Sequence, residues 1–79
     1  MVGDRIEVVG LARLFHGMFG GENRAFTGEV LHVWTSKDDV IPEEYGSENL
    51  LFIKGSVFYR DDNTGEVLWV DPNSFVVIE

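Results

Sequence analysis

Residues 68–79 read LWVDPNSFVVIE and place a tight break between two strand-like runs. Aromatic and β-branched residues dominate both runs, Leu68–Val70 and Phe75–Ile78, and such residues favour strands. The break, Asp71–Ser74, has room only for a turn or for one turn of 3₁₀ helix. The stretch therefore predicts a strand, a 3₁₀ turn and a short closing strand.

Further upstream, the chain contains more short segments with the alternation or composition of strands. These are Arg5–Val9, Phe26–Thr35, Leu50–Ile53 and Val57–Arg60. The last of them is expected to form a hairpin with Glu66–Val70 around DDNTG, in which Gly65 takes the left-handed backbone of a bulged turn. Five or six short strands at this spacing predict an all-β fold, a small barrel formed by one domain, residues 1–79.

The segment Phe26–Thr35 carries apolar groups on both faces, as a central or strongly bent strand does. Because side chains alternate along a strand, Val30 and His32 are expected on one face and Leu31 on the other. Gly28 predicts a bulge or a close approach of two backbones.

Residues 11–21, LARLFHGMFGG, allow two interpretations. The apolar residues at helical spacing are Leu11, Leu14, Phe15 and Met18. Gly17 weakens such a helix by roughly 1 kcal/mol relative to alanine, and Gly20 and Gly21 would end it. We interpret the segment as a long, folded-over loop with at most one or two helical turns.

Charge is the most informative bulk property. The 79 residues include 14 acidic and 6 basic side chains, for a formal net charge of −8. Nucleic-acid-binding proteins use basic groups to neutralise phosphates, so direct binding of DNA or RNA is disfavoured. An acidic surface fits solubility, a basic protein partner, or mimicry of nucleic acid.

Other properties disfavour several classes of protein. The chain has no cysteine, and so neither disulfides nor a zinc site built on thiolates. No apolar run approaches the length of about 18 residues that a membrane span needs. Asp4 and Glu7 stand where a signal peptide would carry basic charge and then an apolar run. We expect a cytoplasmic protein that does not bind membranes.

Residues 36–49, SKDDVIPEEYGSEN, form a long connection that carries five acids. These are Asp38, Asp39, Glu43, Glu44 and Glu48. Connections this long inside a small domain are usually functional or mobile. The acids fit a solvated charge run, a set of oxygen ligands for a divalent cation, or a surface that recognises a basic partner.

The chain offers little for catalysis or cofactor binding. His16 and His32 have no cysteine to activate, and the serines lack the setting of a nucleophile. The segment Asp61–Glu66 is similar to the start of a calcium loop, but Glu66 stands where that loop needs glycine and Pro72 where it needs glutamate. We expect no enzyme, no cofactor and no metal site.

The two ends of the chain resemble Src-homology-3-like barrels. Eukaryotic domains of this fold finish with a glycine-aromatic strand, a proline-serine-asparagine-tyrosine turn and a valine-rich strand. WVDPNSFVVIE is similar, with Pro72 and Asn73 in the turn and Phe75 in the tyrosine's position. The opening VGDRIEVVG looks like the first strand of bacterial and phage relatives, including KOW-type barrels. The resemblance implies the fold of this family.

The resemblance implies less about function. The eukaryotic peptide groove requires tyrosines from the first long loop, a tryptophan, and the turn proline and tyrosine. This chain keeps Pro72 but has Phe75 for the turn tyrosine, and it lacks the alanine-leucine-tyrosine-aspartate-tyrosine opening. KOW-type binding of nucleic acid requires a basic surface, which this acidic chain lacks. A shared fold does not by itself carry a function over.

The leading hypothesis is a non-enzymatic protein-binding module. Large apolar residues between glycines favour an exposed contact patch, and the alternative is a loop that packs over one end of the barrel. The predicted protein-binding residues are Leu14, Phe15, Met18 and Phe19, joined by Asp38, Asp39, Glu43 and Glu44 of the acidic connection. The expected partner is a protein, basic or nucleic-acid-binding, or a second copy of this chain.

Two other hypotheses stay open. An acidic inhibitor that mimics DNA would present ordered carboxylates on one face. A structural, particle-stabilising protein would self-associate. Small size, acidic charge and the lack of catalytic groups are typical of accessory proteins of phages and mobile elements, and we expect such an origin.

Overall fold

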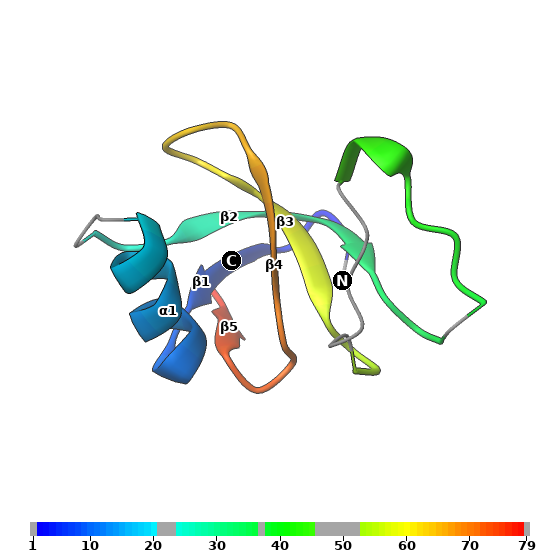
Figure 1. Ribbon diagram of the computed structural model, residues 1–79, viewed down its shortest axis with the longest axis horizontal. Helices are drawn as coiled ribbons and strands as arrows, with labels where there is room; N and C mark the ends of the chain where they lie inside the picture. The colour runs from blue at the N-terminus through cyan, green and yellow to red at the C-terminus, as the bar shows by residue number, and fades with distance from the viewer. Residues whose placement is uncertain (1, 21–23, 37, 46–52, 79) are drawn as a thin grey trace.

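One antiparallel sheet dominates the structure, with the strand order β4-β3-β2-β1-β5 (Figure 1). The computed structural model describes residues 2–20, 24–36, 38–45 and 53–78. The strands are β1 (Arg5–Val8), β2 (Thr27–Val33), β3 (Val57–Asp61), β4 (Val67–Val70) and β5 (Phe75–Val77). The α-helix α1 (Gly10–Gly20) follows β1, and the 3₁₀ helix η1 (Glu43–Tyr45) lies between β2 and β3 in the chain.

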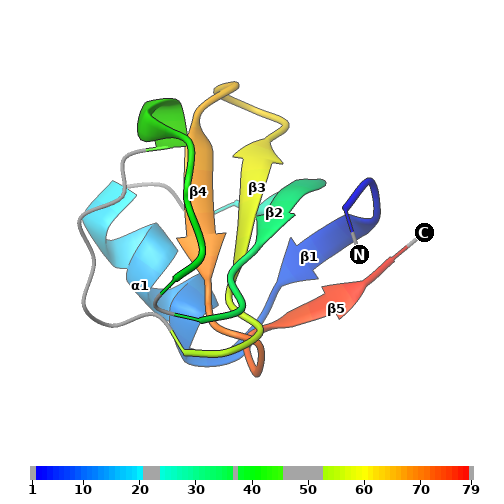
Figure 2. The ribbon, with the colours of Figure 1, turned by 90° about the vertical axis from the view of Figure 1, so that its right-hand side faces the viewer.

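The first four strands pair in chain order, and β5 returns to pair with β1. In this last pairing, Val8 lies opposite Phe75. The sheet twists strongly, so that β3 and β4 run across the direction of β2 (Figure 1, Figure 2). The expected predominance of β-strands is confirmed, because all five strands form one antiparallel sheet. Within the described residues, however, β4 and β5 are opposite edges, so the sheet is open and does not close into a barrel.

The structure has a turn at both predicted positions, but the turn before β5 is not a 3₁₀ helix. Gly65 has a φ of +77° and donates its N–H to the carbonyl of Asp61 at 2.9 Å, which confirms the left-handed glycine of the β3–β4 hairpin. Before β5, the Ser74 N–H donates to the carbonyl of Asp71 at 3.1 Å and closes a single turn. The 3₁₀ helix of the described chain lies elsewhere, at η1 in the acidic connection.

The prediction of a loop with at most one or two helical turns over residues 11–21 is wrong. Gly10–Gly20 form an α-helix of 11 residues, or about three turns. Leucine, alanine, arginine and methionine favour a helix strongly enough to outweigh the cost of Gly17. Gly10, with a φ of +67°, allows the chain to turn from β1 directly into α1.

The strand expected at Leu50–Ile53 falls mostly outside the described residues. Ile53 is described, is exposed, and belongs to no strand. Its carbonyl accepts a hydrogen bond from the Ser56 N–H at 2.9 Å, in a turn that leads into β3.

A β-bulge in β2 changes which side chains face the core. The register between β2 and β3 shifts between Val30, opposite Tyr59, and His32, opposite Phe58. Leu31 is the extra residue and interrupts the alternation, so Val30 lies in the core and His32 lies beside Phe58 on the other face. The prediction that Val30 and His32 share a face is therefore wrong.

The main core lies between α1 and one face of the sheet. Its buried members are Ile6, Val8, Phe26, Val30, Val57, Tyr59 and Val70, with Ala12, Val33, Leu68 and Phe75 packed around them. On the opposite face, Phe58 is fully buried and stacks against Tyr45 of η1 with ring centroids 5.8 Å apart. The acidic connection thus covers part of the second face.

Gly28 is a close-approach position, as predicted. A Cβ atom at this residue would lie 2.0 Å from the carbonyl oxygen of Arg60 on β3. The two backbones can come this close only because residue 28 has no side chain.

Candidate protein-binding site

The apolar stripe of α1 faces solvent. Its exposed fractions are 69% for Leu11, 56% for Leu14, 48% for Phe15 and 61% for Met18. The small side chain of Ala12 faces the core instead. Amphipathic helices normally bury their apolar stripe, so α1 is inverted relative to the usual pattern. The predicted site residues Leu14, Phe15 and Met18 are therefore accessible, and the side chain of Phe19 lies outside the described part of the structure.

A groove of about 590 Å³ runs between α1, β4 and the turn that follows β4. It is lined by Leu11, Ala12, Phe15, His16, Trp69, Val70, Asp71 and Ser74. Most of these side chains are apolar, and among the described lining residues only Asp71 carries a formal charge at neutral pH. The volume is in the range of known ligand-binding clefts.

At one end of the groove, the residue before α1 is hydrogen-bonded to the turn that follows β4. The Val9 N–H, just before α1, donates to the carbonyl of Ser74 at 2.8 Å. The carboxylate of Asp71 accepts the Asn73 N–H at 3.3 Å. Of the predicted protein-binding residues, Phe15 lines this groove. Sequence reasoning missed Trp69 and Asp71, since only the fold brings residues 11–16 beside residues 69–74.

His16 lies on the inner side of α1, between the helix and the sheet. Its ring stacks on Tyr59 at 6.2 Å between centroids and meets Phe26 edge-on at 5.0 Å. Within the described residues, neither His16 Nε2 nor the Tyr59 hydroxyl has a hydrogen-bond partner, although both atoms are buried. Burial lowers the pKa of His16 and raises the pKa of Tyr59, because it disfavours the charged form of each group.

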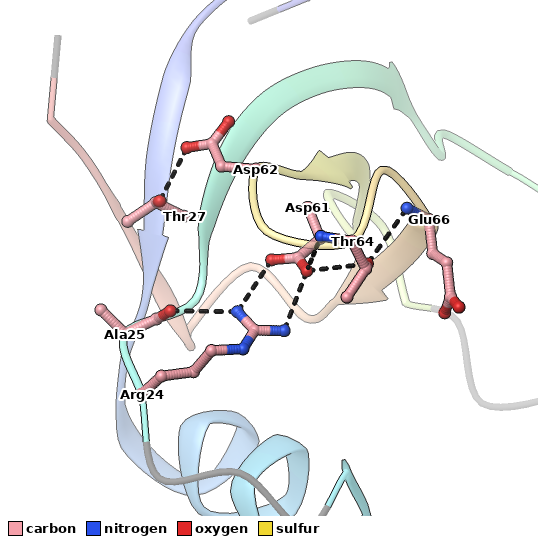
Figure 3. Close-up of polar contacts among 7 residues, drawn as sticks. All are labelled: Arg24, Ala25, Thr27, Asp61, Asp62, Thr64 and Glu66. Carbon is pink, nitrogen blue, oxygen red and sulfur yellow. Dashed lines mark hydrogen bonds and ion pairs between the residues drawn. The ribbon is translucent and has the colours of Figure 1, made fainter.

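Next to the contact between His16 and the sheet, an ion pair fixes the segment that leads into β2. Arg24 donates from its two terminal nitrogens to the two oxygens of Asp61, at 3.0 and 2.9 Å (Figure 3). Thr64 donates its N–H and its hydroxyl to one of these oxygens, at 3.1 and 2.9 Å. Burial alone would raise the pKa of Asp61, but these hydrogen bonds together lower it. The arrangement is structural, because its donors and acceptors satisfy one another.

The acidic connection divides into one anchored and several exposed carboxylates. Asp39 accepts hydrogen bonds from the Thr35 N–H at 3.0 Å and pairs with His32 Nε2 at 3.0 Å. Burial alone would raise the pKa of Asp39, whereas these contacts lower it overall. Asp39 thus anchors the connection to β2, a role that no local pattern in the sequence indicated.

The remaining predicted acids of the connection are exposed, and Glu48 lies outside the described residues. Asp38 lies two residues after Ser36, and Glu43 and Glu44 begin η1. Along the longest axis of the molecule, this connection and α1 lie at opposite ends (Figure 1). The structure therefore does not bring the predicted apolar and acidic residues together into one contact site.

Among the described residues, no group of three or more histidine, aspartate or glutamate side chains could hold a metal ion. No helix in the described part of the chain is long and apolar enough to cross a membrane. No protein-family model, curated protein or solved structure matches the chain.

Proposed function

We propose that this chain is a non-enzymatic protein-binding module that docks its partner on α1 and in the adjacent groove. The observation that carries the proposal is the solvent-facing apolar stripe of the helix, Leu11, Leu14, Phe15 and Met18. Contiguous exposed apolar groups are rare on monomeric proteins and mark interaction surfaces. Methionine and aromatic residues are also enriched at interfaces, where buried aromatics supply much of the affinity.

The charges favour a particular kind of partner. The described lining of the groove includes one negative group, Asp71, and no lysine or arginine, and the whole chain carries a net charge of −8. A complementary segment would insert apolar side chains into the groove and place a lysine or arginine next to Asp71.

The exposed acids of the connection have a different role in this proposal. The connection that carries Asp38, Glu43 and Glu44 lies at the end of the molecule opposite α1 (Figure 1), so in this proposal these acids do not contact a segment bound in the groove. Their field attracts a basic partner during approach, which raises the association rate without adding close contacts.

The proposal keeps the Src-homology-3-like barrel as its architecture. Two features support it: the four-stranded meander whose first strand pairs with β5, and the single turn just before β5. In this arrangement α1 takes the place of the long loop after the first strand.

The test is binding to a peptide array in which apolar residues are flanked by lysine and arginine or, in matched peptides, by glutamate. We expect the basic peptides to bind, and we expect Phe15→Ser to weaken them at least about tenfold, or 1.4 kcal/mol. Val76→Ser is the matched control, because Val76 on β5 is 47% exposed, like Phe15, but lies outside the groove.

Three outcomes would contradict the proposal. Equal effects of Phe15→Ser and Val76→Ser would place binding elsewhere. In a pull-down, the chain could capture only basic nucleic-acid-binding proteins, and DNA could then release them. That result would favour the DNA-mimic hypothesis. A large mass in light scattering that Phe15→Ser abolishes, with no peptide binding, would mean that α1 serves self-assembly.

A further inference from the structure

The contact between α1 and the sheet contains a titratable group, His16, whose neutral state is favoured by burial. The His16 ring lies between Tyr59, stacked at 6.2 Å, and Phe26, edge-on at 5.0 Å. Its Nε2 is buried and has no hydrogen-bond partner in the described chain. A neutral imidazole fits between two aromatic rings, whereas a buried imidazolium needs a counter-ion or water.

The charged and titratable groups around His16 come from every element that packs near it. They are Arg13 on α1, Arg24 before β2, Tyr59 and Asp61 on β3, and Asp71 across the groove. The guanidinium of Arg24 lies 4.0 Å from the centre of the Phe26 ring and that of Arg13 lies 6.0 Å from it. Two cations therefore already lie at the Phe26 ring that His16 contacts, and a charged His16 would add a third.

The charge of Asp61 favours protonation of His16, but this carboxylate is already paired with Arg24, whose charge opposes it. Both of its oxygens accept hydrogen bonds from Arg24, and one also accepts two from Thr64. Asp71 belongs to the far wall of the groove, where it accepts the Asn73 N–H. Within the described residues, a proton added to His16 Nε2 thus has no hydrogen-bond partner as long as α1 stays in place.

We propose that His16 is a pH switch for α1: its protonation in mildly acidic solution releases the helix from the sheet and so dismantles the docking surface. The consequence for binding rests on the proposed function. The release itself is a property of the isolated chain and does not depend on any partner.

The direction of the effect follows from proton linkage. Burial lowers the pKa of His16 in the docked state, so the undocked state holds the proton more tightly. Docking is fully stabilised above the ordinary histidine pKa of about 6.5, and the stabilisation is lost as the pH falls through the docked pKa. One proton changes the undocked population by at most about tenfold per pH unit. The pKa of Asp61 is lowered by its hydrogen bonds, so its contribution falls in a separate, more acidic window.

The experiment is an NMR titration of the isolated chain from about pH 7.5 to about 4.5, combined with amide hydrogen exchange. The variant His32→Gln is used beside the wild type, because the chain has two histidines and this change leaves His16 as the only one. We expect the His16 ring to titrate below pH 6.5 and the amides of α1 to lose protection in the same step, up to about tenfold per pH unit. The amides of β2 and β3 should keep theirs.

His16→Phe is the second variant, since it preserves the aromatic contact and removes the proton. Protection of α1 should then be independent of pH over this range. The inference is overturned if His16 titrates at or above the ordinary value, or if α1 stays protected after His16 is protonated. Both results can be read from His32→Gln even if His16→Phe does not fold. A chain that releases α1 but binds none of the peptides would overturn the proposed function and leave this inference standing.

Discussion

Arg24 and Asp61, 37 positions apart in the sequence, join the segment before β2 to the base of the β3–β4 hairpin through two parallel hydrogen bonds. The Asp61 side chain is fully buried, and that of Arg24 is one-fifth exposed. Two further donors from Thr64 complete the surroundings of the carboxylate. A buried charge satisfied in this way stabilises the fold only while its partners remain in place, so the pair fixes the path of the chain into β2.

Removal of Arg24 should be strongly destabilising. Arg24→Met leaves the buried carboxylate of Asp61 without its cation, and we expect a loss of about 2–4 kcal/mol in the free energy of unfolding measured with urea. The matched control is Arg5→Met, because Arg5 pairs with Asp62 at a site where both side chains are 44% exposed. An exposed pair of this kind contributes little to stability, so we expect a much smaller loss in Arg5→Met. Equal losses in the two variants would show that the Asp61 carboxylate does not depend on Arg24.

The same pair predicts a loss of stability in acid. The pKa of Asp61 is lowered in the folded state, so the ionised group stabilises the fold above its unfolded value of about 3.9, and this contribution disappears as the pH falls through the folded pKa. We expect the free energy of unfolding of the wild type to fall steeply below pH 4. Asp61→Asn should start lower and show a shallower slope in urea titrations from about pH 5 to about 2. An unchanged slope would assign the acid transition to other carboxylates.

Local patterns predicted the parts of the fold that local chemistry determines. Alternation and β-branched residues identified the segments that became β1 and β5, and the DDNTG turn placed the β3–β4 hairpin. The bulge at Leu31 was not predictable, because an extra residue in a strand has no local signature and shows only against its partner. The inverted helix escaped prediction for a similar reason, since spacing reveals a stripe but not the side of the helix that packs.

In the candidate site, too, local sequence patterns predicted some residues and tertiary structure alone determines the others. Sequence reasoning selected Leu14, Phe15 and Met18, which are exposed on α1. It missed the opposite wall, where Trp69 and Asp71 join the groove through tertiary structure alone. Likewise, nothing in the pair Asp61-Asp62 indicates that the first is buried against Arg24 while the second is exposed.

The orientation of α1 can be tested by stability alone. Met18→Gln changes a side chain that is 61% exposed, and we expect the free energy of unfolding to change by no more than about 0.5 kcal/mol. Ala12→Gln places a longer, polar side chain against the core and should be destabilising by about 1–3 kcal/mol. Urea denaturation of the two variants, with far-UV circular dichroism to confirm the helix, makes the comparison. A reversed order would mean that the apolar stripe packs inward.

Gly28 should tolerate no side chain. A Cβ atom at this position would overlap the carbonyl oxygen of Arg60 at 2.0 Å, so β2 and β3 would have to separate where they pair. We expect Gly28→Ala to be destabilising by about 3 kcal/mol or more. Gly65→Asn is the control, since a Cβ there meets nothing within 4 Å and asparagine tolerates its positive φ, so the expected loss is below about 1 kcal/mol. Thermal denaturation of both variants measures the difference, and a fully stable Gly28→Ala would refute the close approach.

The hydroxyl of Tyr59 should be dispensable for folding. It is buried and has no hydrogen-bond partner among the described residues, so the folded state loses its hydration without a replacement. Tyr59→Phe removes this unfavourable burial and keeps the ring that His16 stacks on, and we expect the free energy of unfolding to stay the same or rise by up to about 1 kcal/mol. Ser56→Ala is the contrast, because the buried Ser56 hydroxyl accepts the Ile53 N–H at 3.1 Å and its loss should be destabilising by about 1 kcal/mol. Urea denaturation at pH 7 distinguishes them, and a clear loss of stability in Tyr59→Phe would mean that the hydroxyl is satisfied in the folded protein.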